Sequence, residues 1–450
     1  MRQDLRSFVE AYGRAFPSEV VRVTEPVTTD YDVMALVLEY ERRRRFPILL
    51  LERVQGSDIP IVCNVVASRR ALAFALGTPE AGLALEYARR IKDPIKPVVV
   101  ADPPFRRHVV TGRDLDLARL PIPTYFPGDA GRYLTAGLLV ARDPETGVET
   151  EGYHRFQVKG RDRMGVSLHS RRRMFEYQRR AEALKQPLPC AIVLGVHPLV
   201  SMGSLAYPPP DLGKFEVVGG LFGAPLEVAP CATIDLQVPA AAEIVIEGEI
   251  LPGVREPEGP FGEVAGTYGL QGNRHVFEVS AITMRRDAMY QTALTGMPTT
   301  DNHVQGWPAI CESIKRMAQQ ACPEVVDVHA IGPYYIAIVS IRKRLVHEAR
   351  NVILSVLGPT AGAPQAKYCI VVDPDVNVRD INQVLWALYT RVQPDQDALI
   401  FPPMIGAPLD PSAPVHRHSS KMGFDATVPL GASSERYGRV VVPGVDEVSW

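Results

Sequence analysis

The chain has 450 residues, 46% of them hydrophobic, so it can bury more than one core, because single cores stop growing at roughly 250 to 300 residues. Charged residues make up 22% and the formal net charge is −2, which argues against a global basic field that would attract nucleic acid or anionic lipid. These values predict two or three domains and a small-molecule substrate, with neither nucleic acid nor membrane as a partner.

The six cysteines are scattered along the chain and show neither a C-x-x-C pair nor the spacing of a zinc site or a disulfide framework. No apolar stretch approaches the roughly 18 residues that a membrane-spanning helix requires, and the first residues run straight into an amphipathic pattern. These features predict a protein of a reducing compartment, the cytoplasm.

Residues 1–115 are predicted to form a small α/β lobe. Helical spacing of apolar residues alternates there with short β-branched runs, and Ser68 is placed to begin a helix as its N-cap. The four arginines 42–45 lie at the end of a predicted helix, where they offset the helix dipole, so we expect them to face water rather than to bind an anion. The expected elements are helices over 5–16, 30–45 and 68–76 and strands over 47–54 and 59–66.

A proline-rich segment at 120–127 marks the start of the central domain, predicted over 116–300. Most of its segments have the pattern of short strands separated by Gly and Pro, which is typical of a sheet that curls into a barrel. The expected strands lie within 135–143, 152–160, 189–198, 227–238, 243–250 and 275–284.

The last segment, residues 301–450, alternates strand and helix patterns and is predicted to be a second α/β lobe. The expected elements are helices near 304–320, 344–357 and 379–390 and strands over 325–331, 335–341 and 367–373.

Two glutamates, Glu258 and Glu263, lie five residues apart in a Pro/Gly-rich segment that is expected to follow a strand. If the turn folds back, their carboxylates can converge on one cavity. Burial of like charges then raises the pKa of at least one carboxyl group, which makes it a proton donor near neutral pH. On spacing alone, most such pairs are two solvated acids, so both interpretations stay open at this point.

The string EPEGPFGE, residues 256–263, resembles the active-site signature of the UbiD family of prenylated-flavin decarboxylases. Further strings resemble other parts of that family in the same order, and together they cover nearly the whole chain. The resemblance implies an α+β or α/β multidomain fold in which a central split β-barrel, similar to flavin reductases, is flanked by N-terminal and C-terminal α/β lobes. The other matching strings are 4–8, 23–27, 367–375, 382–388, 408–412 and 421–427.

The resemblance places the family's catalytic Arg–Glu–Glu trio on Arg155, Glu258 and Glu263. Arginine offers a planar, permanently charged fork that can hold a carboxylate bidentately and pair with Glu258. Glu263 is then expected to be the general acid that returns a proton to the carbon left by carbon dioxide. The alternative for Arg155 is a salt bridge on the face of a strand.

The cofactor that the resemblance implies is prenylated FMN, supplied by a flavin prenyltransferase. Lys367 matches the family lysine that meets the flavin phosphate. The positions expected to contact this cofactor are Thr150, Arg155, Gln157, His169, Arg171 and Lys367.

In the family, a divalent metal (manganese or magnesium) and a potassium ion usually bridge the flavin phosphate to the protein. The matching positions here are Thr150, Arg171 and Ala224, whose hydroxyl, guanidinium and methyl groups replace the usual ligands. We therefore predict that Arg171 and Lys367 hold the phosphate without a bridging metal. The alternative is a shift of two residues in the alignment, which would restore His169 as a ligand.

Two loops match pocket-lining segments of the family and place Met297, His303, Met404 and Ile405 at the substrate. The methionines predict an apolar, adaptable wall. His303 either donates to a polar substituent of the substrate or caps the following helix, and the sequence favours neither.

The implied function is reversible, non-oxidative decarboxylation of an aromatic, heteroaromatic or α,β-unsaturated carboxylic acid by a homo-oligomer, either dimer or hexamer. One alternative is a carboxylase subunit of a larger assembly that runs the same site in reverse. The other is a non-catalytic flavin-binding or scaffold protein. Retention of Arg155, Glu258 and Glu263 argues against the second alternative.

Overall fold

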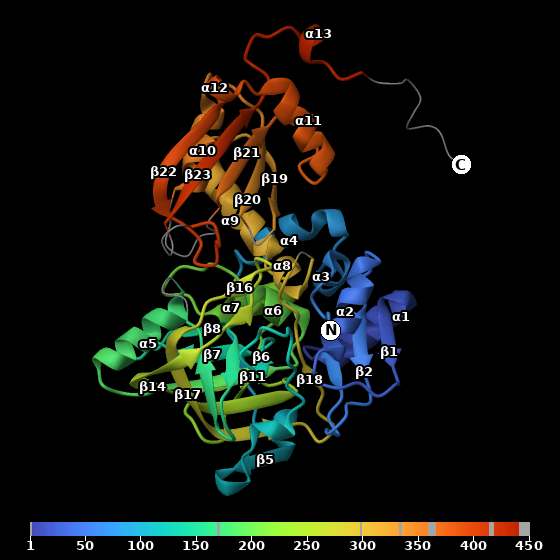
Figure 1. The fold of residues 1–450 in the computed structure, drawn as a ribbon, viewed down its shortest axis with the longest axis vertical. Coiled ribbons are helices and arrows are strands. Elements are labelled where there is room, and N and C mark those ends of the chain that lie inside the picture. The colour runs from blue at the N-terminus through green and yellow to red at the C-terminus, as the bar shows by residue number, and fades with distance from the viewer. Residues whose placement is uncertain are drawn as a thin grey trace. The chain divides into compact units, whose positions relative to one another are not determined.

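The computed structural model describes residues 2–168, 172–297, 299–332, 335–358, 366–413 and 418–440. The chain divides into two compact units (Figure 1): the first comprises the described residues up to 312, and the second comprises those from 313 onward.

The first unit begins with a four-stranded sheet of order β1-β2-β3-β18. The three expected helices of this lobe are present, whereas the short helix α4 was not predicted. Ser68 occupies the N-cap position of α3, but its side chain makes no capping hydrogen bond. The elements are α1 (Leu5–Ala15), β1 (Val20–Val23), α2 (Asp32–Arg42), β2 (Ile48–Leu51), β3 (Ile61–Cys63), α3 (Arg69–Leu76), α4 (Leu83–Arg90) and β18 (Tyr290–Gln291).

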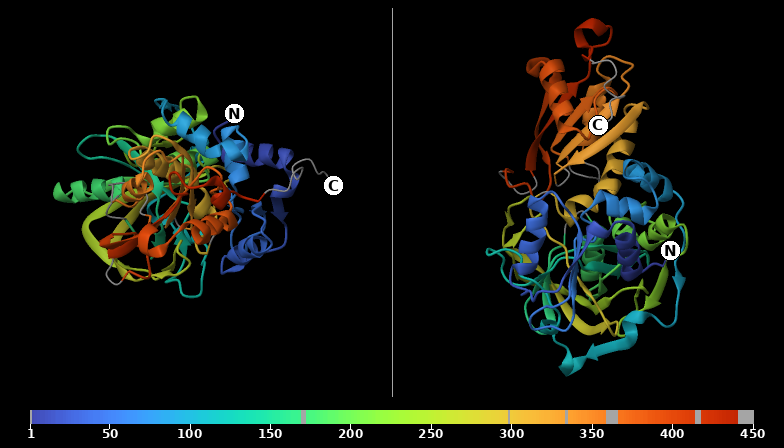
Figure 2. Two further views of the ribbon diagram at one scale, coloured as in Figure 1. Left: turned by 90° about the horizontal axis from the view of Figure 1, so that it is seen from above. Right: turned by 90° about the vertical axis from the view of Figure 1, so that its right-hand side faces the viewer.

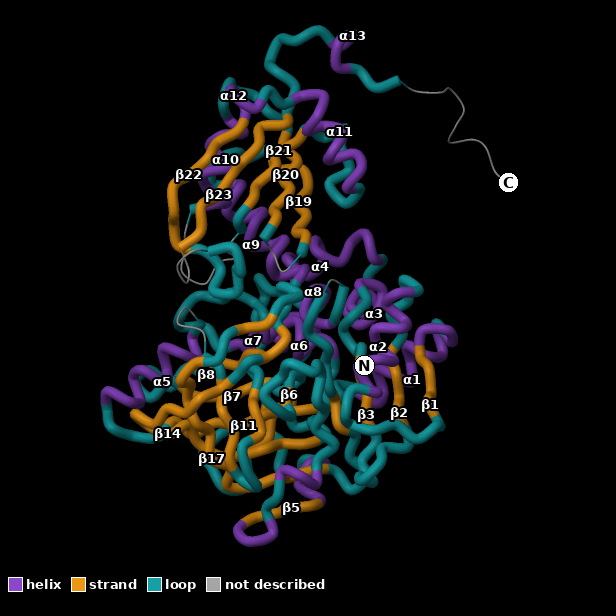
Figure 3. Tube along the Cα trace, viewed as in Figure 1, coloured by secondary structure: helices purple, strands orange, loops and turns teal. Residues whose placement is uncertain are grey.

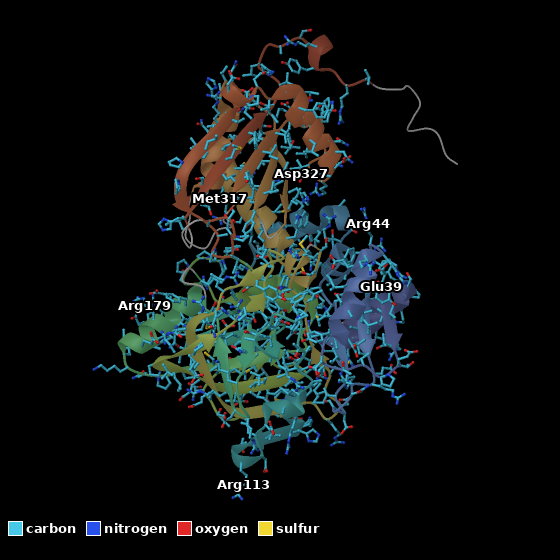
Figure 4. All side chains as sticks on the ribbon, in the orientation of Figure 1. Glu39, Arg44, Arg113, Arg179, Met317 and Asp327 are labelled. Atoms are coloured by element: carbon cyan, nitrogen blue, oxygen red, sulfur yellow. The ribbon has the colours of Figure 1, made fainter. Side chains whose placement is uncertain are left out.

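The arginine block after α2 faces solvent, as predicted. Arg43 and Arg42 pair with Glu39 of the same helix at N–O distances of 2.7 and 3.3 Å. Figure 4 shows Glu39 and Arg44 at the surface of the unit. These ion pairs lie in water and contribute little to stability.

The centre of the first unit is a nine-stranded antiparallel sheet. Its strand order is β6-β9-β10-β17-β14-β11-β7-β8, and β5 adds to β17. Figure 2 shows the long yellow strands of this sheet curving beneath the unit. The strands are β5 (His108–Thr111), β6 (Tyr133–Leu134), β7 (Leu138–Arg142), β8 (Glu149–Tyr153), β9 (Phe156–Val158), β10 (Arg163–Val166), β11 (Leu188–Leu194), β14 (Ile244–Glu258) and β17 (Gly272–Met284).

Alternate residues of β7 and β11 enter two separate cores, which explains why these strands are continuous apolar runs. Leu139 and Ile192 belong to the core inside the curl. Leu138 and Val193 belong to a second core on the outer face, beneath the helices α6 and α7. The sheet is therefore buried on both faces where it is widest.

Three helices of the central segment were not predicted: α5 (Arg173–Ala183), α6 (Pro198–Ser204) and α7 (Lys214–Phe222). The expectation of mostly strands was wrong at these places. All seven residues of α6 are buried, so this helix lacks the polar face that gives a helical period in sequence. Helix α7 carries two adjacent glycines. Glycine has a low helix propensity, so these residues also weaken the helical signal in the sequence.

Strand β14 is much longer than the expected strand over 243–250. It continues through two prolines to Glu258, and its pairing with β17 shifts register twice on the way. Such bulges let a strand bend and accept proline. Glu258 is consequently the last residue of a strand rather than part of a loop.

Smaller elements complete the first unit. A three-stranded sheet comprises β4 (Val98–Val99), β12 (Glu227–Pro230) and β13 (Gln237–Pro239), and a two-stranded one comprises β15 (Phe261–Gly262) and β16 (Tyr268–Gly269). The boundaries proposed at residues 115 and 300 stay a prediction, because β5 joins the central sheet and β18 joins the N-terminal one. The helix α8 (Asp301–Val304) follows, and α9 (Trp307–Gln319) continues into the second unit.

The second unit contains a five-stranded sheet of order β19-β20-β21-β23-β22, drawn in orange in Figure 3. Ile353 of α10 packs over Gly423, which pairs with Cys369, whereas Val384 of α11 shares a core with Ile370. Because neighbouring residues of a strand face opposite sides, the two helices cover opposite faces. The elements are β19 (Val325–Ile331), β20 (Ile336–Ile341), α10 (Glu348–Leu357), β21 (Tyr368–Val372), α11 (Ile381–Arg391), α12 (Pro394–Asp397), β22 (Ala398–Ile405), β23 (His418–Ala426) and α13 (Ser434–Tyr437).

The helices and strands predicted for this lobe are present, but β22 and β23 were not anticipated.

All six cysteines are buried free thiols. No helix in the described part of the chain is both long and apolar enough to cross a lipid bilayer.

Candidate active site

One arginine lies between the two glutamates singled out from the sequence. Arg155 donates to Glu258 through Nε and Nη2, at 2.9 and 2.8 Å from Oε1 and Oε2. Its remaining terminal nitrogen, Nη1, pairs with Oε1 of Glu263. The three residues are thus one charged network, and the interpretation of the glutamates as two separately solvated acids is wrong.

The network is assembled from separate strands of the central sheet. Arg155 lies in the two-residue link between β8 and β9, and Glu258 ends β14. Glycines provide room for the side chains: a Cβ atom at Gly165 would lie 3.2 Å from Cγ of Glu258, and one at Gly269 would lie 3.0 Å from Cγ of Glu263. A larger side chain at either glycine would displace one of these two carboxylates.

The loop between the glutamates is held by the side chains of Gln157 and Asp129, which accept hydrogen bonds from its backbone. Gln157 accepts from the backbone N–H of Gly259 at 3.3 Å and donates to the carbonyl of Ala130 at 3.0 Å. Asp129 accepts from the backbone N–H of Gly262 at 2.9 Å. Gln157, predicted to contact the cofactor, positions the loop between the two glutamates. Asp129 was not foreseen, because nothing in its local sequence sets it apart.

Burial differs between the two carboxylates. The side chain of Glu258 is fully buried, whereas those of Glu263 and Arg155 are 12% and 11% exposed. A buried carboxylate held bidentately cannot leave its partner without a large cost. Glu263 has one contact with arginine and reaches solvent, so it is held less firmly than Glu258.

Aromatic rings line the apolar side of the network. The guanidinium carbon of Arg155 lies 5.4 Å from the ring centre of Phe261, whose ring packs on that of Tyr133 at 4.3 Å. Burial raises the pKa of Tyr133, and the charge of Glu258 raises it further. The Tyr133 hydroxyl therefore stays protonated as a donor near neutral pH.

His303 caps a helix. Its Nδ1 accepts from the backbone N–H of Thr300 at 3.3 Å, which completes the capping box of α8. Its Nε2 lies 2.9 Å from the carbonyl of Val264 and donates to it. Both ring nitrogens are engaged, and burial lowers the pKa of His303 to about 4. His303 thus helps to cap α8, the helix that contains it, rather than a helix that follows it, and the contact with Val264 fixes the residue that follows Glu263.

The other predicted positions are distributed over the chain. Met297 is 63% exposed, and its sulfur lies against Gly266 in the loop after Glu263. Met404 and Ile405 lie on β22 in the second unit. Lys367, also in the second unit, donates to Asp410 at 2.9 Å and to the Ser412 hydroxyl. His169 and Arg171 lie outside the described residues.

Two of the positions that match the family's metal ligands, Thr150 and Ala224, offer neither a carboxylate nor an imidazole, and Arg171 lies outside the described residues. The Thr150 hydroxyl is buried without a hydrogen-bond partner, whereas Ala224 is exposed beyond the C-terminal end of α7. Over the described residues, no group of three or more His, Cys, Asp or Glu side chains is placed to hold a metal ion. A hard or borderline cation takes such ligands, so these residues do not fit the metal.

Known proteins resemble the chain along its whole length. Three family models for 3-octaprenyl-4-hydroxybenzoate carboxy-lyase match in order: the N-terminal domain over residues 16–91, the Rift-related domain over 97–298 and the C-terminal domain over 305–426. The anhydromevalonate phosphate decarboxylase of Methanothermobacter thermautotrophicus is 33% identical over 441 residues, which are 97% of this chain and 99% of the relative.

Solved structures of related enzymes are also similar to the chain along nearly its whole length. The UbiD-class enzyme HmfF from Pelotomaculum thermopropionicum, in complex with FMN, superposes with a TM-score of 0.91 and 36% identity over 99% of each chain. An evolved dimeric form of that enzyme, in complex with prFMN, is also similar, with a TM-score of 0.88 and 34% identity over 100% of this chain and 99% of that one. Vanillic acid decarboxylase from Sedimentibacter hydroxybenzoicus, in its closed form, superposes with a TM-score of 0.90 and 30% identity over 99% of this chain and 97% of that one. The chain therefore belongs to the UbiD family of prenylated-FMN-dependent decarboxylases.

Proposed function

We propose that this carboxy-lyase uses prenylated FMN to decarboxylate, reversibly and without net oxidation, an aromatic, heteroaromatic or α,β-unsaturated acid. The observation that carries the proposal is Arg155 held between a buried and a partly exposed glutamate. Such a network provides a cation beside a titratable acid in a site with little water, where charges interact strongly. A scaffold protein would have no need of it.

Each member of the network has a distinct task. Glu258 fixes the plane of the guanidinium through its bidentate contact. Arg155 then orients the carboxylate of the substrate with the remaining donor capacity of its fork. Glu263 delivers the proton to the substrate carbon after carbon dioxide has left, and it takes that proton back when the reaction runs as carboxylation.

The cofactor supplies the electron sink for the breaking carbon–carbon bond, and the protein supplies orientation and electrostatics. Among the described residues, the unpartnered hydroxyl of Thr150 and the side chain of Gln157 beside the catalytic loop fit the role of cofactor contacts. Lys367, which donates to Asp410 at 2.9 Å, stays a proposed phosphate ligand. Arg171 remains a proposed phosphate ligand.

The names of the relatives support two candidate classes of substrate. The names of two relatives are vanillic acid decarboxylase and anhydromevalonate phosphate decarboxylase. Dehydration of mevalonate gives an α,β-unsaturated acid, so the second name favours a phosphorylated aliphatic substrate. Release of carbon dioxide from vanillic acid, 3,4-dihydroxybenzoic acid and anhydromevalonate phosphate would separate the classes. Exchange of labelled bicarbonate into the acid would show whether the carboxylase direction also operates.

Protein produced without a flavin prenyltransferase is expected to be folded but inactive, because nothing in the sequence resembles a prenyl-transfer site. Co-production with the transferase should give active enzyme with a modified flavin. The measurement is the mass and absorbance spectrum of the released cofactor together with carbon dioxide release. Full decarboxylase activity with unmodified FMN would refute the proposed cofactor.

Prolonged treatment with a chelator is expected to leave the bound flavin and the activity nearly unchanged, because the described residues lack a metal ligand set. Replacement of Arg171 by alanine should release the flavin. Elemental analysis before and after chelation is the measurement. Stoichiometric manganese or magnesium, with loss of activity on chelation, would show that His169 is a ligand.

We further propose that the enzyme is a cytoplasmic homo-oligomer, a dimer or a hexamer. One relative has been solved in an evolved dimeric form, which supports self-association in the family. Light scattering of the purified protein would give the number of subunits.

A further inference from the structure

One arginine of the charged network faces three carboxylates. Glu258 holds Arg155 at both of its oxygens, and Glu263 meets the remaining terminal nitrogen. The third carboxylate is that of Asp129, on which the charge of Arg155 also acts. If all three acids were ionised, a single positive charge would have to compensate for three negative ones in a site with little water, which is costly.

The next cation along the network has counter-charges of its own. Cε of Lys159 and Cγ of Glu258 would both touch a Cβ atom added to the same glycine, at 2.9 and 3.2 Å, so the two side chains are neighbours. However, Nζ of Lys159 lies 3.9 Å from Glu256, and Arg163 bridges Glu256 and Glu278. These two cations and two acids balance one another, so they leave the shortage of positive charge around the arginine of the network unchanged.

The other titratable groups near the network contribute no positive charge near pH 7. Burial raises the pKa of both Tyr125 and Tyr133, whose hydroxyls therefore stay neutral. Burial lowers the pKa of His303 to about 4, so its imidazole is neutral as well. The hydroxyl of Tyr268 accepts from the backbone N–H of Gly128 at 3.0 Å.

The carboxyl group of Asp129 is held by hydrogen-bond donors. Its Oδ1 accepts from the backbone N–H of Gly262, and its Oδ2 from that of Phe126, both at 2.9 Å. A protonated carboxyl group would need an acceptor for its own proton, and neither partner is one. Burial raises the pKa of Asp129, but these N–H groups and the charge of Arg155 oppose the rise. Because Gly262 directly precedes Glu263, the anion is held one residue from the expected acid.

We propose that Asp129 is a positioning residue of the reaction: its negative charge, held beside Gly262, keeps Glu263 in the protonated form that can donate to the substrate carbon. Arg155 alone would favour the ionised form of Glu263, and the two neighbouring anions oppose it. Glu258 also orients the arginine, whereas Asp129 can be changed without loss of that contact. The inference rests on the proposed function and goes beyond the support that Asp129 gives to the loop.

The competing explanation is that Asp129 only ties two loops together. Asp129→Asn keeps one oxygen that can accept from Gly262, but it loses the charge and the second acceptor. A purely structural role predicts a lower unfolding temperature and no change in the protonation of Glu263. The proposed role predicts that Glu263 loses its proton at a lower pH in this variant.

The test follows the carbonyl stretching band of protonated carboxyl groups by infrared spectroscopy of the purified full-length protein. The difference between the parent and Glu263→Gln isolates the band of Glu263 from those of other buried acids, such as Glu151 and Asp301. This band should be present near pH 7 and disappear as the pH rises. In Asp129→Asn, measured against the double variant with Glu263→Gln, it should disappear at a pH lower by about 0.5 or more, because an anion in a site with little water acts strongly on its neighbour.

Two further variants separate the charge of Asp129 from its support of the loop. Asp129→Glu keeps the charge, so the band should disappear close to the pH of the parent even if the longer side chain lowers kcat. Asp116→Asn is the matched control, because Asp116 also accepts from a backbone N–H, that of Ala118 at 2.9 Å, and lies 3.7 Å from a different arginine, Arg161. It should leave the band unchanged. The pH at which kcat for carbon dioxide release declines should follow the band in each variant, because the acid must be protonated to act.

An unchanged band in Asp129→Asn would overturn the proposal, whatever the unfolding temperature. Absence of a Glu263-dependent band from the parent near pH 7 would also overturn it, and this result needs no variant of Asp129, so it holds even if Asp129→Asn fails to fold. Failure of the parent to release carbon dioxide from every acid tested would instead refute the proposed function, and this inference with it.

Discussion

Replacement of Glu263 by glutamine is expected to reduce turnover by roughly 100- to 10,000-fold, the range typical for loss of a general acid or base, while flavin stays bound. The amide keeps the shape of the side chain and can still meet Nη1 of Arg155 through its oxygen, but it has no proton to transfer at neutral pH. The measurement is kcat for carbon dioxide release, together with the flavin content of the purified variant.

Glu256→Gln is the matched control for this substitution. Glu256 lies in the same segment but is 30% exposed and pairs with Arg163 at 2.7 Å. Its loss should leave kcat close to the parent value. Activity of Glu263→Gln within about a factor of three of the parent, far above the typical loss, would remove Glu263 as the acid.

The second large effect is expected for Arg155→Lys, which keeps the charge but loses the fork. An ammonium group is a point charge and cannot hold Glu258 at both oxygens while it also meets Glu263. We expect kcat to fall by about 100-fold or more, comparable with loss of an acid or base. Stability should fall by about 1 to 3 kcal/mol, the cost of buried acceptors without partners. Both are measurable on one preparation, by steady-state assay and by denaturant unfolding.

Arg163→Lys provides the comparison, because Arg163 also bridges two glutamates, Glu256 at 2.7 Å and Glu278 at 2.9 Å. These partners are 30% and 47% exposed, so the pairs lie in a high dielectric and are worth at most about 1 kcal/mol. Equal effects of the two substitutions on kcat would show that Arg155 has no special part in the reaction.

The local sequence was sufficient to predict most helices of the N-terminal and C-terminal lobes. Apolar spacing predicted four helices, because each has one buried face and one solvent-exposed face. They are the helices over 5–16, 30–45, 344–357 and 379–390. The central helix α6 was missed because it is buried on every side, which removes the period on which the prediction depends. The extension of β14 to Glu258 was missed because its two prolines resemble a loop, and only bulged pairing with β17 accommodates them.

The residue types of the catalytic site were readable from the sequence, but their connections were not. The string around Glu258 and Glu263, together with Arg155, identified the family, because these residue types are the ones that its chemistry with the cofactor requires. The tertiary structure alone decided that Arg155 holds both carboxylates, that Gln157 and Asp129 fix the loop between them, and that the ammonium of Lys214 lies beside Glu151. These partners lie between 63 and 133 positions apart in the sequence. Only packing of the sheet and its helices brings such distant groups together, because backbone and side-chain contacts at this separation have no local pattern that a sequence can display.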